Sequence, residues 1–124
     1  MNVVDSSGWL EYFADGHNAA FFAPAIEATR ELLVPTLSLY EVFKRVLQQR
    51  GEGEALQAVA LMQQGQVVDL TAAVALFAAK ARIERRLPMA DSIMLVTARL
   101  HGATFWTQDA DFDGVDGVKY VAKR

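Results

Sequence analysis

Four acidic residues stand where short apolar runs meet expected helices: Asp5, Glu41, Asp91 and Asp109. Asp5 ends the first apolar run, and Asp109 follows the run Ala103–Thr107. If the strands are parallel neighbours, their carboxyl ends meet along one rim of the sheet. Several negative charges on one rim repel each other and favour a bound cation. Oxygen ligands suit Mg²⁺ or Mn²⁺, so the spacing predicts chemistry on phosphate esters.

The composition excludes several other kinds of site. The chain of 124 residues has no cysteine, which rules out disulfides, thiolate metal sites and thiol nucleophiles. His17 and His101 are the two imidazoles, so we expect the ligands of any metal to be oxygen atoms. A net charge of −3 argues against simple binding to a nucleic-acid backbone, although basic residues are clustered locally.

The length and the hydropathy pattern predict one folded domain over residues 1–124. Hydrophobic residues make up 52% of the chain, which is too high for a disordered segment. No run approaches the roughly 18 apolar residues of a membrane span. The first residues lack the basic segment of a signal peptide. We therefore expect a cytoplasmic protein with no membrane partner.

Apolar runs alternate with helical periodicities along the chain. Strands are expected at Val3–Val4, Leu32–Val34, Val67–Val68, Ala103–Thr107 and Val118–Val121. Helices are expected at Ser6–Ala14, from Asn18 to Arg30 with an interruption at Pro24, from Thr36 or Ser38 to Arg50, at Glu54–Gln64, after Thr71 with Val74, Phe77 and Ala81 on one side, and at Pro88–Leu100. This alternation predicts an α/β fold with a parallel sheet of about five strands and helices on both faces.

Each acidic position also has a purely structural explanation. Ser38 and Glu41 match a capping box, in which the glutamate bonds back to the serine amide. Asp91 falls in the first turn of a helix, where the helix dipole favours a carboxylate by about 0.3–1 kcal/mol. Asp5 can cap the first helix, and Asp109 belongs to a turn rich in Asp and Gly. Four such residues at matching junctions favour a functional site over four separate coincidences.

Two other acidic motifs do not fit the chain. The segment Asp109–Gly114 imitates the start of a calcium loop, but the twelfth position is Tyr120 rather than Glu, and the loop follows a strand. A phosphatase of the two-aspartate type requires a second Asp two residues after Asp5, where this chain has Ser7. Both patterns are therefore disfavoured.

Four segments resemble the motifs of PIN-domain ribonucleases: Val4–Ser7, Leu39–Val42, Leu87–Ser92 and Thr107–Phe112. In size and in these motifs the chain is similar to the VapC-type toxins of toxin–antitoxin pairs. The resemblance covers essentially the whole chain, and the third and fourth segments are its specific part.

The resemblance implies an α/β/α sandwich and a Mg²⁺- or Mn²⁺-dependent endoribonuclease that uses metal-activated water. It also implies a homodimer and a cognate antitoxin protein. The residues that match the family's functional positions are the catalytic and metal-binding Asp5, Glu41, Asp91 and Asp109, the further acidic Asp111, and the supporting hydroxyls of Ser6 and Thr107.

Three questions stay open at this stage. A non-catalytic PIN-like module could use the same acidic pocket to bind a basic segment of a partner. A phosphotransfer or phosphatase domain could share the topology. The basic residues are either solvated helix faces or contacts to the RNA backbone. The candidates for RNA contact are Lys44, Arg45, Arg82, Arg85 and Arg86.

Overall fold

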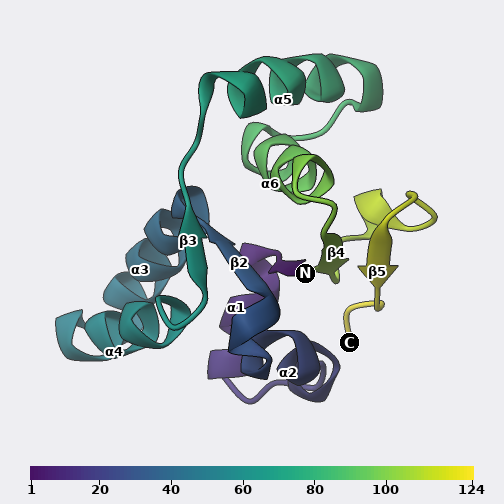
Figure 1. Ribbon diagram of the computed structural model, residues 1–124. Helices are drawn as coiled ribbons and strands as arrows, with labels where there is room; N and C mark the ends of the chain where they lie inside the picture. Colours follow the sequence, from purple (N-terminus) through teal and green to yellow (C-terminus); the bar gives the residue numbers. More distant parts are fainter.

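The computed structural model describes residues 1–124 and contains one central sheet (Figure 1). Its strands are β1 (Asn2–Val4), β2 (Leu32–Pro35), β3 (Gln66–Val68), β4 (Thr104–Thr107) and β5 (Val118–Tyr120). Every pair of neighbours is parallel, and the order across the sheet is β3-β2-β1-β4-β5. The predicted parallel sheet of about five strands is therefore confirmed.

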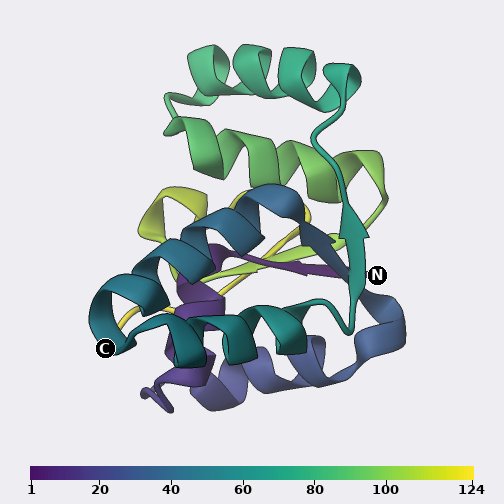
Figure 2. The ribbon, with the colours of Figure 1, turned by 90° about the vertical axis from the view of Figure 1, so that its left-hand side faces the viewer.

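Six α-helices connect and cover the strands (Figure 2). They are α1 (Ser6–Phe13), α2 (Ala19–Glu27), α3 (Thr36–Arg50), α4 (Glu52–Met62), α5 (Ala72–Arg85) and α6 (Met89–Leu100), and short 3₁₀ turns occupy η1 (Thr29–Glu31) and η2 (Ala110–Phe112). None of these helices has the length and apolar character needed to cross a membrane.

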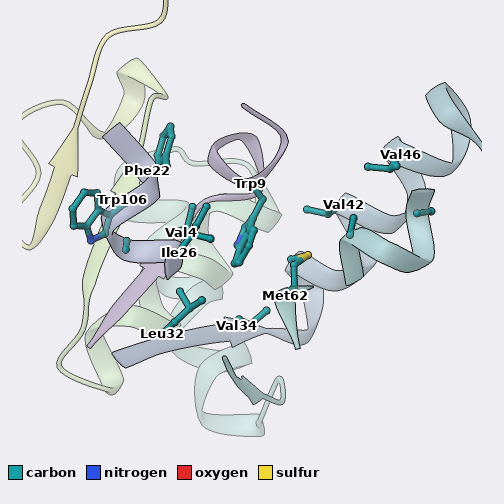
Figure 3. Packing of buried hydrophobic residues seen from close by; sticks show 13 residues of the cluster. Val4, Trp9, Phe22, Ile26, Leu32, Val34, Val42, Val46, Met62 and Trp106 are labelled. Atoms are coloured by element: carbon teal, nitrogen blue, oxygen red, sulfur yellow. The ribbon is translucent and has the colours of Figure 1, made fainter. Parts of the chain in front are cut away.

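Alternating side chains on the strands serve two separate cores. In β2, Leu32 and Val34 face one core, which contains buried side chains of α1 to α4 (Figure 3). Leu33 faces the opposite core, together with Phe105 of β4 and Met94 of α6. Successive side chains of a strand point to opposite faces of the sheet, so a strand buried on both faces is apolar at every position. Helices therefore cover both faces, as the α/β/α prediction requires.

Helix α5 belongs to neither of these two cores. It packs on the outer side of α6, away from the sheet (Figures 1 and 2). A third cluster joins the two helices through Val74 and Ala78 on α5 and Ile93 and Val96 on α6. The predicted inner side of α5 is correct for Val74 but wrong for Phe77, which is 54% exposed. Ala78, one residue further along the helix, takes the inward position instead.

The expected interruption at Pro24 is also wrong, because Pro24 lies within the continuous helix α2. A proline in a helix interior removes one backbone hydrogen bond and costs about 3 kcal/mol. Burial of Phe22, Ala25 and Ile26 on the same helix offsets this loss, at about 1.5–3 kcal/mol for each large apolar side chain.

Candidate functional site

Asp5 lies at the carboxyl end of β1, the central strand of the sheet. Its amide donates to the carbonyl of Trp106 on β4 (2.9 Å), which fixes the backbone at the rim. Its carboxylate is buried, and Oδ2 accepts hydrogen bonds from Thr107 Oγ1 (2.9 Å) and Ser7 Oγ (3.1 Å). The predicted supporting hydroxyl of Thr107 therefore contacts Asp5 directly. Sequence reasoning did not assign the same role to Ser7.

Burial raises the pKa of Asp5 above its ordinary value of 3.8. The hydrogen bonds from Thr107 and Ser7 lower this pKa, while the negative charge of Asp109 raises it. The net direction is upward, because the low-dielectric surroundings disfavour the charged form. A buried carboxylate beside a second carboxylate is a position that a cation would stabilise.

Glu41 lies on α3, and its Oε1 accepts a hydrogen bond from Ser6 Oγ at 2.8 Å. The capping-box explanation is wrong, because α3 begins at Thr36 and the buried Ser38 lies inside the helix. The Ser38 hydroxyl points instead toward the Met94 sulfur at 3.9 Å. Glu41 is therefore bonded to the first residue of α1 rather than to the start of its own helix.

Asp91 lies in the first turn of α6 and is half-buried. Burial, followed by the charges of Asp5, Asp109 and Glu41, raises its pKa from the ordinary value of 3.8 to about 7. A hydrogen bond with Asp109 acts in the same direction. The charges of the other three predicted acidic positions thus all act on Asp91, although the four come from separate parts of the chain.

Asp109 begins the turn after β4 and takes part in the hydrogen bonds of that turn. Its amide donates to Thr107 Oγ1 (3.0 Å), and its Oδ1 accepts from the Asp111 amide (3.0 Å). The structural explanation for Asp109 as part of a turn is therefore correct, since its side chain caps the 3₁₀ turn η2. The Asp111 side chain is exposed, and it is not among the charges that raise the pKa of Asp91.

Two of the basic candidates lie beside Glu41. Lys44 and Arg45 on α3 line a cavity of about 310 Å³ together with Ser6, Ser7 and Glu41. This cavity gives a ligand access to Glu41 from the side on which Lys44 and Arg45 lie.

The other basic candidates lie around the connection from α5 to α6. Arg82 donates to the carbonyl of Leu87 (3.1 Å) and so braces the loop that precedes Asp91. Arg82 and Arg86 line a separate hollow with Pro88. Burial lowers the pKa of Arg99, and the positive charge of Arg85 lowers it further. Arg82 therefore has a structural role that the sequence did not indicate.

The donor set fits a hard divalent cation. It consists of carboxylate and hydroxyl oxygens, which Mg²⁺ and Mn²⁺ prefer. The ion pairs of the structure are Arg50–Glu54 and Lys80–Glu84, so no Lys or Arg neutralises the four carboxylates. As they stand, no three of these side chains form a finished coordination site. The fit therefore rests on the chemistry of the donors and on their uncompensated charge.

Asn18 and Gln108 are buried polar residues near the site that the sequence did not identify. Asn18 stands at the N-cap position of α2, but its side chain makes no capping bond to that helix. Its amide donates instead to Gln108 Oε1 (2.9 Å) and to the carbonyl of Ala122 (3.0 Å). In the sequence, Gln108 could have been noticed because it lies between Thr107 and Asp109, which were both assigned to the site. No sequence feature connected Asn18 with the site.

Comparison with known proteins places this geometry in a family. Similar solved structures include a toxin–antitoxin complex from Klebsiella pneumoniae (23% identity, 96% of both chains, TM-score 0.79). VapC20 from Mycobacterium tuberculosis, a toxin that cleaves the sarcin–ricin loop, is 18% identical over 94% of this chain and 95% of its own (TM-score 0.76). VapBC2 from Rickettsia felis, bound to a promoter DNA fragment, is 10% identical over 98% and 97% of the two chains (TM-score 0.74).

At these identities the solved structures show a shared fold. A search of curated proteins finds no match. The sequence model of the PIN domain matches residues 3–118, which include all four carboxylates and most of the sheet. The chain therefore belongs to the PIN domain family.

Proposed function

We propose that this PIN domain is a Mg²⁺- or Mn²⁺-dependent endoribonuclease and the toxin of a toxin–antitoxin pair. The observation that carries the proposal is the meeting of four carboxylates at one rim with no ion pair to any of them. Similarity of fold to VapC20 and to toxin–antitoxin complexes supports the choice of RNA as substrate and of an antitoxin as partner.

Asp5, Glu41, Asp91 and Asp109 would hold the metal. When bound, a divalent ion activates water and neutralises charge on the phosphate oxygens. The protein's own residues would set the geometry: Ser6 orients Glu41 through its 2.8 Å hydrogen bond, and Thr107 orients Asp5 through its 2.9 Å hydrogen bond. Asp111 is exposed nearby and is proposed as a further ligand on the strength of the resemblance alone.

Lys44 and Arg45 are proposed to contact the RNA backbone, because they line the same cavity as Glu41. Arg85 and Arg86 are proposed as a second contact at the end of α5. Phosphate contacts of this kind give an affinity that falls as the salt concentration rises. Substituting Lys44 or Arg45 by Gln should therefore weaken RNA binding and reduce its salt dependence, with metal binding unchanged.

A cognate antitoxin is proposed to place a basic segment, led by an arginine, in the acidic site. A guanidinium offers five donors in a planar fork and can bind two carboxylates at once. Antitoxin and metal should then compete, so raising Mg²⁺ should weaken the complex. Equal antitoxin affinity for the parent and for Asp5→Asn plus Asp91→Asn would place the partner elsewhere.

A homodimer is proposed through the outer face of α5. Leu76 and Ile83 lie two helical turns apart on this helix and are 73% and 80% exposed. Exposed apolar side chains of this size are typical of an interface. Sedimentation of Ile83→Lys should show a monomer where the parent is dimeric, and an unchanged mass would exclude this face.

The deciding experiment is RNA cleavage by the purified chain with Mg²⁺, with Mn²⁺ and with a chelator. The proposal requires cleavage that depends on the metal and is lost in Asp5→Asn. If the parent binds metal and antitoxin but leaves RNA intact, the chain is a PIN-like binding module whose acidic pocket takes a basic segment.

A further inference from the structure

Asn18 and Gln108 form a buried polar pair beside the acidic rim. Their side chains are 4% and 6% exposed, and they lie 90 positions apart in the sequence. The Asn18 amide uses both of its protons, one on Gln108 Oε1 (2.9 Å) and one on the carbonyl of Ala122 (3.0 Å). A buried amide is costly unless it is hydrogen-bonded, so this pair holds one arrangement.

Gln108 lies between the segment that carries Asp109 and the start of α1, which follows Asp5. Its backbone stands between Thr107, which donates to Asp5, and Asp109. Its side-chain Nε2 points to the carbonyl of Ser7 at 3.5 Å, a long contact that joins it to the first turn of α1. The side chain of Gln108 therefore links the segment that carries Asp109 to the start of α1, which Asp5 precedes directly.

The segment after β5 is fixed to the same place. The amide of Val121 donates to the carbonyl of Thr107 (3.1 Å), and the carbonyl of Ala122 accepts from Asn18. Asn18 thus connects the start of α2, the turn after β4 and the segment after β5. None of these contacts involves a charged group, so they hold the turns without adding to the repulsion at the rim.

We propose that Asn18 and Gln108 act as a clamp that sets the position of Asp109 relative to Asp5 for metal binding. Both are positioning residues, since neither is placed among the metal ligands. The inference rests on the proposed metal-dependent function. Residues behind the ligands of a metal site commonly change its affinity by about 10- to 100-fold when they are substituted.

The first test measures Mn²⁺ binding to the whole chain by titration calorimetry, without RNA. Gln108→Met keeps the length of the side chain and removes its hydrogen bonds, and Asn18→Ala removes the other half of the clamp. Each should weaken Mn²⁺ binding by about tenfold. The double variant should be little weaker than either single variant, because both remove the same unit.

The matched control is Thr97→Ala on α6. Thr97 is also buried, and its hydroxyl donates to the carbonyl of Ile93 at 2.7 Å. This bond lies within α6 and connects to neither Asn18 nor Gln108. This variant should lower thermal stability and leave Mn²⁺ affinity unchanged. If Gln108→Met and Asn18→Ala behave in the same way as Thr97→Ala, they serve stability alone and the proposal is wrong.

The second test is independent of metal. Hydrogen exchange of the Asp109 and Asp111 amides reports on the turn, because both amides are bonded within it. Their exchange should be about tenfold faster in Gln108→Met than in the parent, as local opening becomes easier. Unchanged exchange overturns the clamp. A parent that binds no Mn²⁺ refutes the proposed function and the positioning role together, and the exchange rates still decide whether the clamp holds the turn.

Discussion

The four carboxylates lie at the carboxyl end of the sheet and are held in different ways on its two sides. Asp5, after β1, belongs to the strand side, and Glu41 on α3 and Asp91 on α6 belong to the helix side. On the strand side, Asp5 is buried and receives hydrogen bonds from two neutral hydroxyls, those of Thr107 and Ser7. On the helix side, Asp91 is half-buried, and the influences on its pKa all disfavour its charged form. The hydroxyl donors thus offset part of the cost of charge on Asp5, whereas nothing offsets the burial and repulsion at Asp91.

This difference indicates that Asp5 and Asp91 have different roles within one site. Hydroxyl donors anchor the central strand's carboxylate, so its position depends little on what is bound. The carboxylate on α6 has no such hydroxyl donor, and every influence on its pKa disfavours its charged form. The next four predictions test this contrast, beginning with the largest expected effect.

Removing one ligand charge from either side should abolish RNA cleavage. Asp5→Asn and Asp91→Asn should each lower the rate by at least about a hundredfold, because the metal loses a negatively charged ligand. The measurement is the initial rate of cleavage in saturating Mg²⁺. Asp113→Asn, which changes an exposed aspartate, is the matched control and should cleave at the parental rate. Parental rates in both site variants would exclude the ribonuclease mechanism.

Mg²⁺ or Mn²⁺ should raise the melting temperature of the parent. A ligand that binds only the folded state stabilises it by about 2.7 kcal/mol at a concentration a hundredfold above its dissociation constant. The increase should disappear in Asp109→Asn when melting is followed by calorimetry. A melting temperature that does not respond to metal would favour the binding module instead.

Thr107→Val should show how far the strand side depends on its hydroxyls. Thr107 is fully buried, donates to Asp5 and accepts from the Asp109 amide. The variant leaves the Asp109 amide without this partner and Asp5 with the Ser7 hydroxyl alone, which should lower the free energy of unfolding by about 1–3 kcal/mol. Denaturant unfolding measures the loss, and Ser6→Ala on the helix side should cost less, because Glu41 is half-buried. An equal loss in both variants would remove the contrast between the two sides.

The metal-free protein should become less stable as pH rises from about 4 to 7. Burial and neighbouring charge raise the pKa of Asp91 in the folded state to about 7, from an ordinary value of 3.8. The folded state therefore binds more protons than the unfolded state between these values, and the free energy of unfolding falls as pH rises. Three pKa units correspond to about 4 kcal/mol. Because Asp91 is only half-buried, we expect about 1–2 kcal/mol after screening.

Asp91→Asn should make this part of the stability–pH curve less steep, as measured by denaturant unfolding in the presence of a chelator. Some slope should remain, because the pKa of Asp5 is also raised. The variant should also be more stable than the parent at pH 8. A parent whose stability rises between pH 4 and 7 would show that the pKa of Asp91 is not raised in the folded state, and the contrast between the two sides would fail.

Much of the fold and part of the site follow from the sequence alone. Alternating apolar runs and helical periodicities are local patterns, and they predicted the five strands and their parallel arrangement. Asp5, Glu41, Asp91 and Asp109 were identified because four acidic residues stand at matching strand–helix junctions and match the motifs of PIN-domain ribonucleases. In the structure, the charges of the other three all act on Asp91. Their roles as metal ligands stay a prediction.

Contacts between distant segments were decided only by the tertiary structure. Glu41 bonds to Ser6, 35 positions away, rather than to the nearby Ser38, because α3 begins before Ser38 and buries it. Asn18 meets Gln108 across 90 positions for the same kind of reason. Local patterns predict which residues form an element, but packing decides which side of that element is buried and which polar groups then find each other.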